Sequence, residues 1–244
     1  MKRAEGGVVG GALAGSWALR RLEYVAATLI HLVRHGEVHN PEGILYGRIP
    51  GYQLSELGRR MAAASATSLR ERGAPVSRVI ASPLERAQES AQPWADAFGL
   101  QVETDDRLIE PRNRFEGKRF EFGLQVLAKP AVWPWVVNPF KPSWGEPFAS
   151  VADRMLAAVE DAWASTPEGD VVLVSHQLPI WMVQRSVTGR RLFHDPRKRR
   201  CALSSITTLA IRENRGPGDP HFVEVDYQEP AAELAVRSID LGAV

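Results

Sequence analysis

From Thr28 onward, short apolar segments alternate along the chain with longer segments in which apolar and polar positions recur at helical spacing. Three of the short segments are rich in branched apolar side chains, which indicates buried strands. They are TLIHLV (28–33), SRVIAS (77–82) and DVVLVSH (170–176). Strands that alternate with helices predict an α/β protein whose sheet carries helices on its faces.

The longer segments carry the usual start and stop signals of helices. Ser55 caps a helix over 56–72 that ends at Gly73, and Ser82, Pro83 and Glu85 have the spacing of a capping box for the next helix. Two further helices are expected, one over 151–165 that begins near Ser150 and Asp153, and one over 178–189. Late strands are expected over 202–211 and 221–227. Their partly polar pattern favours a place at the edge of the sheet.

The ends of the chain and the segment 111–147 depart from this alternation. We expect one domain over residues 25–230, in which 111–147 is a substrate or cap insertion that contains a short helix and the tryptophans 133, 135 and 144. Residues 1–24 are expected to be a flexible extension rather than an export signal, because their apolar part is rich in glycine and Arg20 and Arg21 interrupt it. Residues 231–244 are expected to be a C-terminal tail.

Composition and charge exclude several classes of protein. Thirty Lys and Arg residues against 29 Asp and Glu residues give a net charge of +1, so no global field favours nucleic acid or an anionic membrane. The single Cys201 excludes an internal disulfide and favours the cytoplasm, and no apolar run has the length of a membrane span. The basic run at 197–200 lacks interleaved aromatic residues, so it favours a solvated turn over a surface that stacks bases.

Polar side chains stand at or just after the ends of the three predicted buried strands. Arg34 and His35 follow the first strand, Ser82 ends the second and Arg86 lies four residues later, and His176 ends the third. Because ligands of open α/β sheets bind beyond the carboxyl ends of the strands, these residues are expected to converge. Two arginines and two histidines in one place would form a site for an anion.

The motifs that carry these residues resemble one known family. RHGE (34–37) after an apolar strand, then LSELG (54–58), SPLERA (82–87), LIE (108–110) and VVLVSH (171–176) resemble, in this order, the histidine phosphatase superfamily, which includes the phosphoglycerate mutases. The resemblance extends from about Thr28 to Leu209. It implies a three-layer α/β/α sandwich with a mostly parallel central sheet.

The resemblance also implies roles for single residues. His35 is the expected nucleophile that forms a phosphohistidine, Arg34 and Arg86 are expected to grip the phosphoryl oxygens, and His176 to stabilise charge in the transition state. Glu110 is the expected proton donor, with Glu116 as the competing choice. Further expected substrate-binding residues are Asn40, Tyr46, Gly47 and Gln177. His39 stands where relatives often have an aromatic residue.

The function expected from these residues is hydrolysis of a small phosphate ester, without a metal or other cofactor. A phosphoglycerate mutase, which would need 2,3-bisphosphoglycerate, is less favoured because the glutamate-arginine-histidine-tyrosine-glycine segment of the glycolytic mutases is absent after Leu108. A non-catalytic phospholigand-binding protein is the alternative of another class. No nucleic acid or membrane partner is expected, and a homodimer is left open.

A metal hydrolase is the remaining alternative, because His31, His35 and His39 recur at intervals of four residues. That spacing aligns side chains on a helix, whereas this segment is predicted to be a strand that runs into a loop. The sequence therefore favours separate roles for the three histidines over a metal site.

Overall fold

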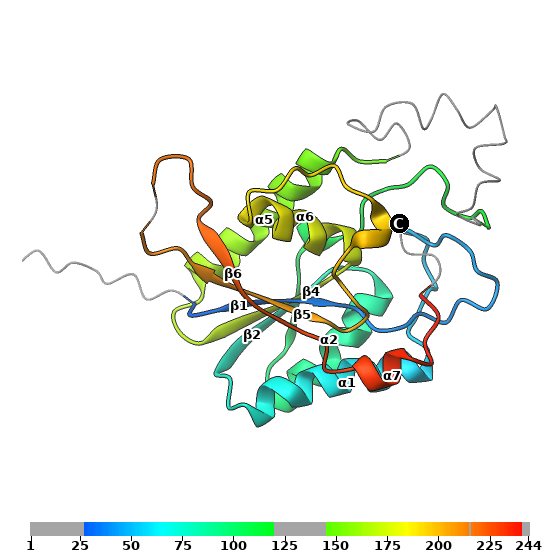
Figure 1. Ribbon diagram of the computed structural model, residues 1–244. Coiled ribbons are helices and arrows are strands. Elements are labelled where there is room, and N and C mark those ends of the chain that lie inside the picture. Colours follow the sequence, from blue (N-terminus) through cyan, green and yellow to red (C-terminus); the bar gives the residue numbers. More distant parts are fainter. Residues whose placement is uncertain (1–26, 120–144, 215, 241–244) are drawn as a thin grey trace, which may run out of the picture.

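The computed structural model describes residues 27–119, 145–214 and 216–240, and the expected extension over 1–24, the short helix and the tryptophans of the insertion lie outside these residues. The described chain forms a six-stranded sheet with helices on both faces (Figure 1). Its strands are β1 (Ile30–Arg34), β2 (Val76–Ala81), β3 (Val102–Thr104), β4 (Asp170–Ser175), β5 (Ile206–Ile211) and β6 (Phe222–Gln228). Its α-helices are α1 (Glu56–Glu71), α2 (Glu85–Phe98), α5 (Phe148–Ser165), α6 (Gln177–Val187) and α7 (Ala232–Ala235), and two short 3₁₀ turns lie at η1 (Asp106–Leu108) and η3 (Pro196–Lys198).

The strand order is β3-β2-β4-β1-β5-β6. The first four of these strands pair in parallel, whereas β5 pairs antiparallel with both β1 and β6. The predicted mostly parallel sheet is confirmed. The two late strands lie on one side of β1, and β6 alone of the pair is at the edge. The three-residue strand β3 had no separate apolar signal in the sequence.

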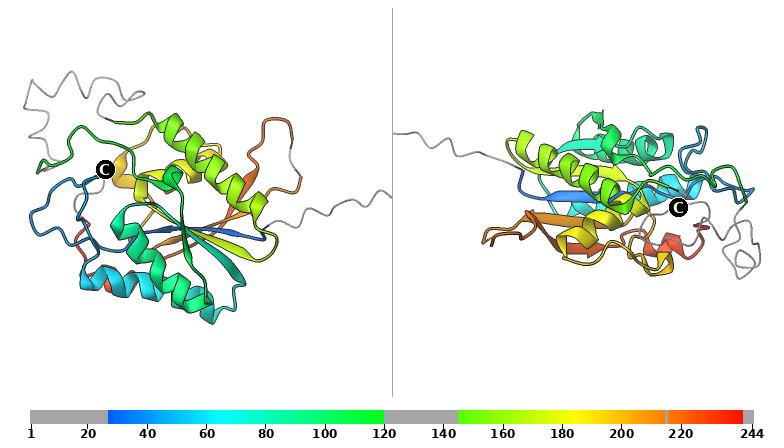
Figure 2. Two further views of the ribbon diagram at one scale, coloured as in Figure 1. Left: turned by 180° about the vertical axis from the view of Figure 1, so that it is seen from behind. Right: turned by 90° about the horizontal axis from the view of Figure 1, so that it is seen from above.

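Successive side chains of a strand point to opposite faces of the sheet, and here both faces are buried. Ile30, Leu32 and Leu173 pack with α5 and α6 in one apolar cluster. Val33 and Val172 pack with α1 and α2 in the other. Figures 1 and 2 show the resulting three layers, with α5 and α6 on one side of the sheet and α1 and α2 on the other.

The four helices predicted within the described residues are confirmed, but two of the predicted starts are wrong. Ser55 caps α1 as expected, since its side chain accepts from the N–H of Gly58. The capping box at Ser82 does not form, because α2 begins only at Glu85 and its N-cap, Leu84, has no side-chain oxygen to offer. Likewise α5 begins at Phe148, before the expected start, and Ser150 donates to Glu146 instead of capping the helix.

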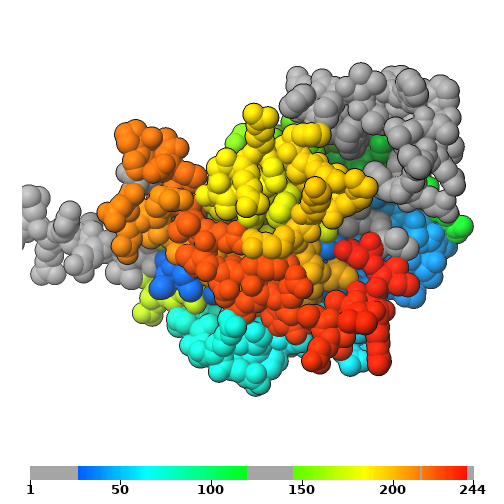
Figure 3. Space-filling model, in the orientation of Figure 1, coloured from blue at the N-terminus to red at the C-terminus, as the bar shows by residue number. Residues whose placement is uncertain are grey.

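The C-terminal segment folds back over the first part of the chain. The short helix α7 packs on α1, and Figure 3 shows this segment lying against α1 and beside the loop that follows β1. The backbone N–H of Ile239 donates to Glu37 Oε1 at 2.7 Å, which brings the next residue, Asp240, to the end of β1. Within the part of the chain that is described, no helix is both long enough and apolar enough to cross a membrane.

Candidate active site

The side chains expected to bind an anion come together where β1, β2 and β4 end. Arg34 is the last residue of β1 and lies opposite Ser175 of β4, so His35 and His176 follow on neighbouring strands. Their rings are 5.2 Å apart between centroids. Arg86 is the second residue of α2, which leads away from β2. All four side chains are buried, as the convergence of parallel strand ends requires.

His35 is held in one tautomer. Its Nδ1 lies 2.7 Å from the carbonyl oxygen of Gly36, and because a carbonyl can only accept, Nδ1 carries the proton. Nε2 is therefore left with a lone pair. Burial lowers the pKa of His35 well below its usual value, and the charges of Arg86 and Arg34 lower it further. The ring is thus neutral at physiological pH, the state in which an imidazole nitrogen acts as a nucleophile.

The turn that carries His35 is fixed by close packing on both helices of this face. The N–H of Gly36 donates to Ser90 Oγ at 3.0 Å, and Ser90 in turn donates to the carbonyl of Arg86 at 2.7 Å. A Cβ on Gly36 would lie only 2.3 Å from the carbonyl oxygen of Gly58 in α1. Glycine is required at both positions because the backbones of the loop and the helix touch there.

Arg86 reaches the centre of the site from α2 with its orientation fixed. Its NH2 group donates to the carbonyl of Gly47 at 2.7 Å, and its guanidinium lies 4.7 Å from the ring centroid of Tyr46, in cation–π geometry. Its Nε is buried and has no hydrogen-bond partner among the described residues. An unpaired buried donor of this kind is costly unless an acceptor, such as a phosphoryl oxygen, binds there.

Arg34 makes a contact that the sequence did not suggest. NH1 donates to the carbonyl of Cys201 at 2.8 Å. The carboxylate of Asp240 accepts hydrogen bonds from both NH1 and NH2, at 2.9 and 2.5 Å. Arg34 is fully buried, whereas the side chain of Asp240 is 40% exposed. A carboxylate thus binds the guanidinium fork with the bidentate geometry that phosphoryl oxygens also use. No local signal predicts a contact between residues at opposite ends of the chain.

His176 joins the site to a buried acid. Its Nε2 lies 2.8 Å from Ser82 Oγ, and its Nδ1 lies 3.6 Å from Glu110 Oε2. Burial lowers the pKa of His176 well below its usual value, and Arg86 adds to this effect. The hydroxyl of Ser82 does not cap α2 and is instead a hydrogen-bond partner of His176. The position of Ser82 at the end of a predicted strand was the only sequence signal for this contact.

Glu110 has the properties of an acid that exchanges protons near neutral pH. Its side chain is buried, and burial raises its pKa from 4.5 to about 7 although Arg86 and other arginines oppose the shift. One oxygen, Oε1, has no partner among the described residues. The competing acid, Glu116, lies in the loop instead, where its Oε1 accepts the N–H of Asn113 at 3.0 Å. The structure places Glu110, and not Glu116, against His176.

The remaining expected binding residues have different surroundings. Tyr46 is buried under Arg86, and Gly47 has a φ of +41° and holds Arg86 through its carbonyl. Asn40 is half-buried, and its amide both accepts from and donates to the backbone of Ile44 across a turn. His39 is exposed at the surface. Gln177 accepts from Arg199 NH1 at 3.2 Å.

Arg199 corrects the interpretation of the basic run at 197–200. Arg197 and Lys198 are exposed as a solvated turn requires, but Arg199 points inward and its Nε donates to His194 Nε2 at 2.9 Å. Burial lowers the pKa of Arg199 to about 10, while the negative charge of Glu110 opposes this shift. A third arginine therefore adds to the positive potential around Glu110. The pattern of the run did not distinguish the residue that turns inward.

His31, His35 and His39 lie in three different environments, as expected for a strand that runs into a loop. His31 lies within the sheet, with Nδ1 3.0 Å from Thr208 Oγ1 and Nε2 3.3 Å from Asp170 Oδ2. His35 is in the anion site and His39 is at the surface. Among the residues that the structure describes, no group of three or more His, Cys, Asp or Glu side chains is arranged to hold a metal ion.

Comparison with known proteins finds relatives in sequence and in fold. The chain is 51% identical over 205 residues to the "Uncharacterized protein Rv0525" of Mycobacterium tuberculosis, covering 84% of this chain and 98% of the relative. It is 33% identical over 167 residues to phosphoserine phosphatase 1 of Hydrogenobacter thermophilus, covering 65% and 75% of the two chains. The fold matches that of the mycobacterial glucosyl-3-phosphoglycerate phosphatase Rv2419c with a TM-score of 0.62 and 24% identity, over 81% of this chain and 96% of the other.

The family match extends over the residues that converge at the ends of β1, β2 and β4. Residues 30–218 match the histidine phosphatase superfamily (branch 1), and this range includes the two buried histidines, Arg34, Arg86 and Glu110. The resemblance found in the RHGE, SPLERA and VVLVSH motifs is therefore confirmed over most of the chain. This protein is a member of the histidine phosphatase superfamily.

Proposed function

We propose that this protein is a phosphomonoester hydrolase that acts through a phosphohistidine at His35, without a metal or other cofactor, on a small phosphate ester in the cytoplasm. The observation that carries the proposal is the contact between His35 Nδ1 and the carbonyl of Gly36 at 2.7 Å. It holds the proton on Nδ1, so that Nε2 presents its lone pair beside two buried guanidinium groups.

In the first step, His35 Nε2 attacks the phosphorus atom and the bond from phosphorus to the ester oxygen breaks. Arg34 and Arg86 bind the phosphoryl oxygens, and His176 donates to the same oxygens as negative charge builds up on them. The protonated carboxyl of Glu110 gives its proton to the leaving oxygen, which departs as an alcohol. The positive charge of the phosphorylated imidazole is stabilised by the Gly36 carbonyl at Nδ1.

In the second step, water attacks the phosphorus atom and the bond from phosphorus to Nε2 breaks. Glu110 is now a carboxylate, and it takes a proton from the attacking water, so that inorganic phosphate forms and both residues return to their first state. A pKa of about 7 suits both tasks, because the protonated and deprotonated forms of Glu110 are then similarly populated at neutral pH.

A phosphoglycerate mutase would use the same first step but would return the phosphoryl group to its substrate instead of to water. We favour the hydrolase because the sequence EPRNRFEG after Ile109 lacks the segment typical of the glycolytic mutases. A non-catalytic binding protein is less favoured, since such a protein needs no buried acid beside the second histidine. The mutase reading would require 2,3-bisphosphoglycerate, and the hydrolase reading would not.

Release of inorganic phosphate from p-nitrophenyl phosphate in the presence of EDTA tests the proposal. We expect turnover by the wild type, a loss of at least about 10³-fold in His35→Ala, and unchanged turnover in His39→Ala, which removes an exposed imidazole from the same segment. Turnover that requires a divalent ion would contradict the metal-independent mechanism. Conversion of 3-phosphoglycerate to 2-phosphoglycerate without release of phosphate would establish the mutase instead.

A further inference from the structure

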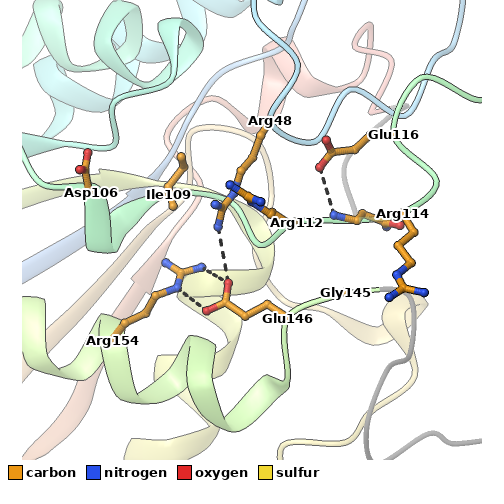
Figure 4. A pocket seen from close by; sticks show the side chains of 10 residues that line it. Arg48, Asp106, Ile109, Arg112, Arg114, Glu116, Gly145, Glu146 and Arg154 are labelled. Carbon is orange, nitrogen blue, oxygen red and sulfur yellow. Dashed lines mark hydrogen bonds and ion pairs between the residues drawn. The ribbon is translucent and has the colours of Figure 1, made fainter.

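A second concentration of charge lies beside the catalytic centre. A cavity of about 880 Å³ opens between the loop after β1, the segment that follows η1, and the start of α5 (Figure 4). Arginines enter it from all three: Arg48 from the loop, Arg112 and Arg114 from the segment, and Arg154 from α5. Three acids, Asp106, Glu116 and Glu146, also line it. The cavity therefore has more guanidinium groups than carboxylates.

The cavity is joined to the catalytic centre through the backbone. Arg48 Nε donates to the carbonyl of Glu110, the proposed acid. The residue before Arg48 is Gly47, whose carbonyl orients Arg86. The cavity is also lined by Ile109, which directly precedes Glu110. The wall of the cavity and the anion site therefore share two stretches of backbone, Gly47 with Arg48 and Ile109 with Glu110.

The arginines of the cavity differ in how fully they are engaged. Glu146 pairs with two of them, at 2.9 Å from Arg154 Nε and 3.5 Å from Arg48 NH2, so one carboxylate is shared between two cations. Arg154 also donates to the carbonyl of Arg107 at 2.5 Å, which fixes it against the wall. Arg112 is exposed, and its side chain has no hydrogen bond or ion pair among the described residues.

The shared carboxylate leaves a surplus of positive charge that faces the cavity. Figure 4 shows the guanidinium groups of Arg48 and Arg112 side by side, across from the pair formed by Arg154 and Glu146. Burial lowers the pKa of Arg48, and the neighbouring charges of Arg154 and Arg112 act in the same direction, against Glu146. Adjacent guanidinium groups that repel one another are stabilised when an anion binds between them.

We propose that this cavity, which we call the distal arginine site, binds a second anionic group of the substrate whose phosphate ester reacts at His35. The group is a carboxylate or a second phosphate, and Arg48 and Arg112 are the residues that recognise it. This inference rests on the proposed function, because it assumes that the phosphate ester lies between Arg34 and Arg86. It makes Arg112 a specificity-determining residue that takes no part in the chemical step.

Paired substrates that differ by one anionic group test this inference. O-phosphoserine and O-phosphoethanolamine differ by a carboxylate, and fructose 1,6-bisphosphate and fructose 6-phosphate differ by a phosphate. We expect kcat/KM of the wild type to be about 10- to 100-fold higher for the more anionic member of at least one pair, as a charge-assisted contact provides. The pair that shows the preference identifies which anion the site takes.

Variants of Arg112 then assign the preference to the distal arginine site. We expect Arg112→Gln to lose most of it and Arg112→Glu to reverse it, with kcat/KM for the less anionic member and for p-nitrophenyl phosphate within about twofold of the wild type. Arg190→Gln, which removes another exposed arginine, serves as the matched control and should keep the preference. A wild type without preference in either pair, or a preference that Arg112→Glu retains, would overturn the inference.

A binding measurement separates this inference from the proposed function. Calorimetric titration of the His35→Ala protein with the members of each pair does not depend on turnover. Tighter binding of the more anionic member, lost in the His35→Ala, Arg112→Glu double variant, would support the distal arginine site even if no ester were hydrolysed. Equal binding of both members of each pair would overturn the inference even if p-nitrophenyl phosphate were hydrolysed by the wild type.

Discussion

The raised pKa of Glu110 gives the sharpest test of the catalytic assignment. The pH dependence of kcat/KM reports the ionisation of the free enzyme, and the proposed first step needs Glu110 protonated. Its pKa of about 7 therefore predicts that kcat/KM for an alkyl phosphate such as glycerol 2-phosphate, whose leaving alkoxide needs a proton, falls above pH 7, by about tenfold for each further pH unit. The lowered pKa values of His35 and His176 place the loss of activity on the acid side well below pH 6.5.

The same ionisation affects the free energy of unfolding, and the size of this effect follows from the pKa shift of Glu110. The pKa of Glu110 is about 7 in the folded protein against 4.5 for the unperturbed group, so the folded state binds this proton more tightly. Stability linked to Glu110 is therefore full below pH 4.5 and decreases as the pH rises through 7. A shift of this size corresponds to about 3 kcal/mol. Glu110→Gln, which cannot ionise, is expected to raise the free energy of unfolding at pH 8 by up to that amount.

The assay compares Glu110→Gln with Glu116→Gln, which changes the competing acid of the neighbouring loop. Glu110→Gln should lower kcat/KM by about 10²-fold or more at pH 6 and abolish the fall above pH 7, while unfolding by urea at pH 8 shifts to higher concentration. Glu116→Gln should keep the pH profile of the wild type. A profile that loses its alkaline limb in Glu116→Gln but keeps it in Glu110→Gln would refute the assignment.

Three further predictions follow from single contacts. Asp240→Asn removes a carboxylate that competes with phosphate for the guanidinium group of Arg34, so the inhibition constant of inorganic phosphate should fall by about threefold to tenfold. A rise in this constant would show that Asp240 supports phosphate binding instead. Arg86→Lys cannot hold the Gly47 carbonyl and a phosphoryl oxygen in one planar fork, so kcat/KM should fall by about 10²-fold in steady-state assays, and an unchanged value would contradict the role of the fork. Gly58→Ala places a Cβ 2.0 Å from the Glu37 carbonyl oxygen, so the free energy of unfolding measured with urea should fall by about 1–3 kcal/mol. An unchanged urea midpoint would contradict the close approach of the two backbones.

The parts of the fold that could be predicted from sequence are those set by local pattern. Val171, Val172, Leu173 and Val174 form a continuous apolar run, and a strand buried on both faces needs such a run. The site was predictable for a related reason. Residues that directly follow parallel strands meet at one edge of the sheet whatever the rest of the chain does, so Arg34 and His176 were brought together by topology alone.

The contacts that the sequence did not show depend on distant parts of the chain or on small local shifts. Asp240 reaches Arg34 only because the C-terminal segment packs on α1 and Ile239 bonds to Glu37. Ser82 has the sequence signature of a cap, but α2 begins three residues later and the hydroxyl turns to His176. Arg199 is a basic residue like its exposed neighbours, and only the tertiary fold turns it toward His194.

The choice between Glu110 and Glu116 shows the limit of motif spacing most clearly. The two acids are six positions apart in one loop, and spacing alone left both open. Burial distinguishes them, because Glu110 is shielded beside His176 while Glu116 braces the backbone of Asn113. Shielding is what changes the pKa of a carboxyl group, and it is a property of the folded chain and not of the motif.

The central claim is that His35 becomes phosphorylated during turnover. Rapid acid-free quenching of the wild type with a ³²P-labelled ester, within the first turnover, should trap label on the protein that is stable in alkali and lost in acid, as the bond from phosphorus to an imidazole nitrogen requires. The label should map to the peptide that contains His35 and be absent from His35→Ala. Hydrolysis that proceeds at the wild-type rate in His35→Ala, or label on a different residue, would contradict the account.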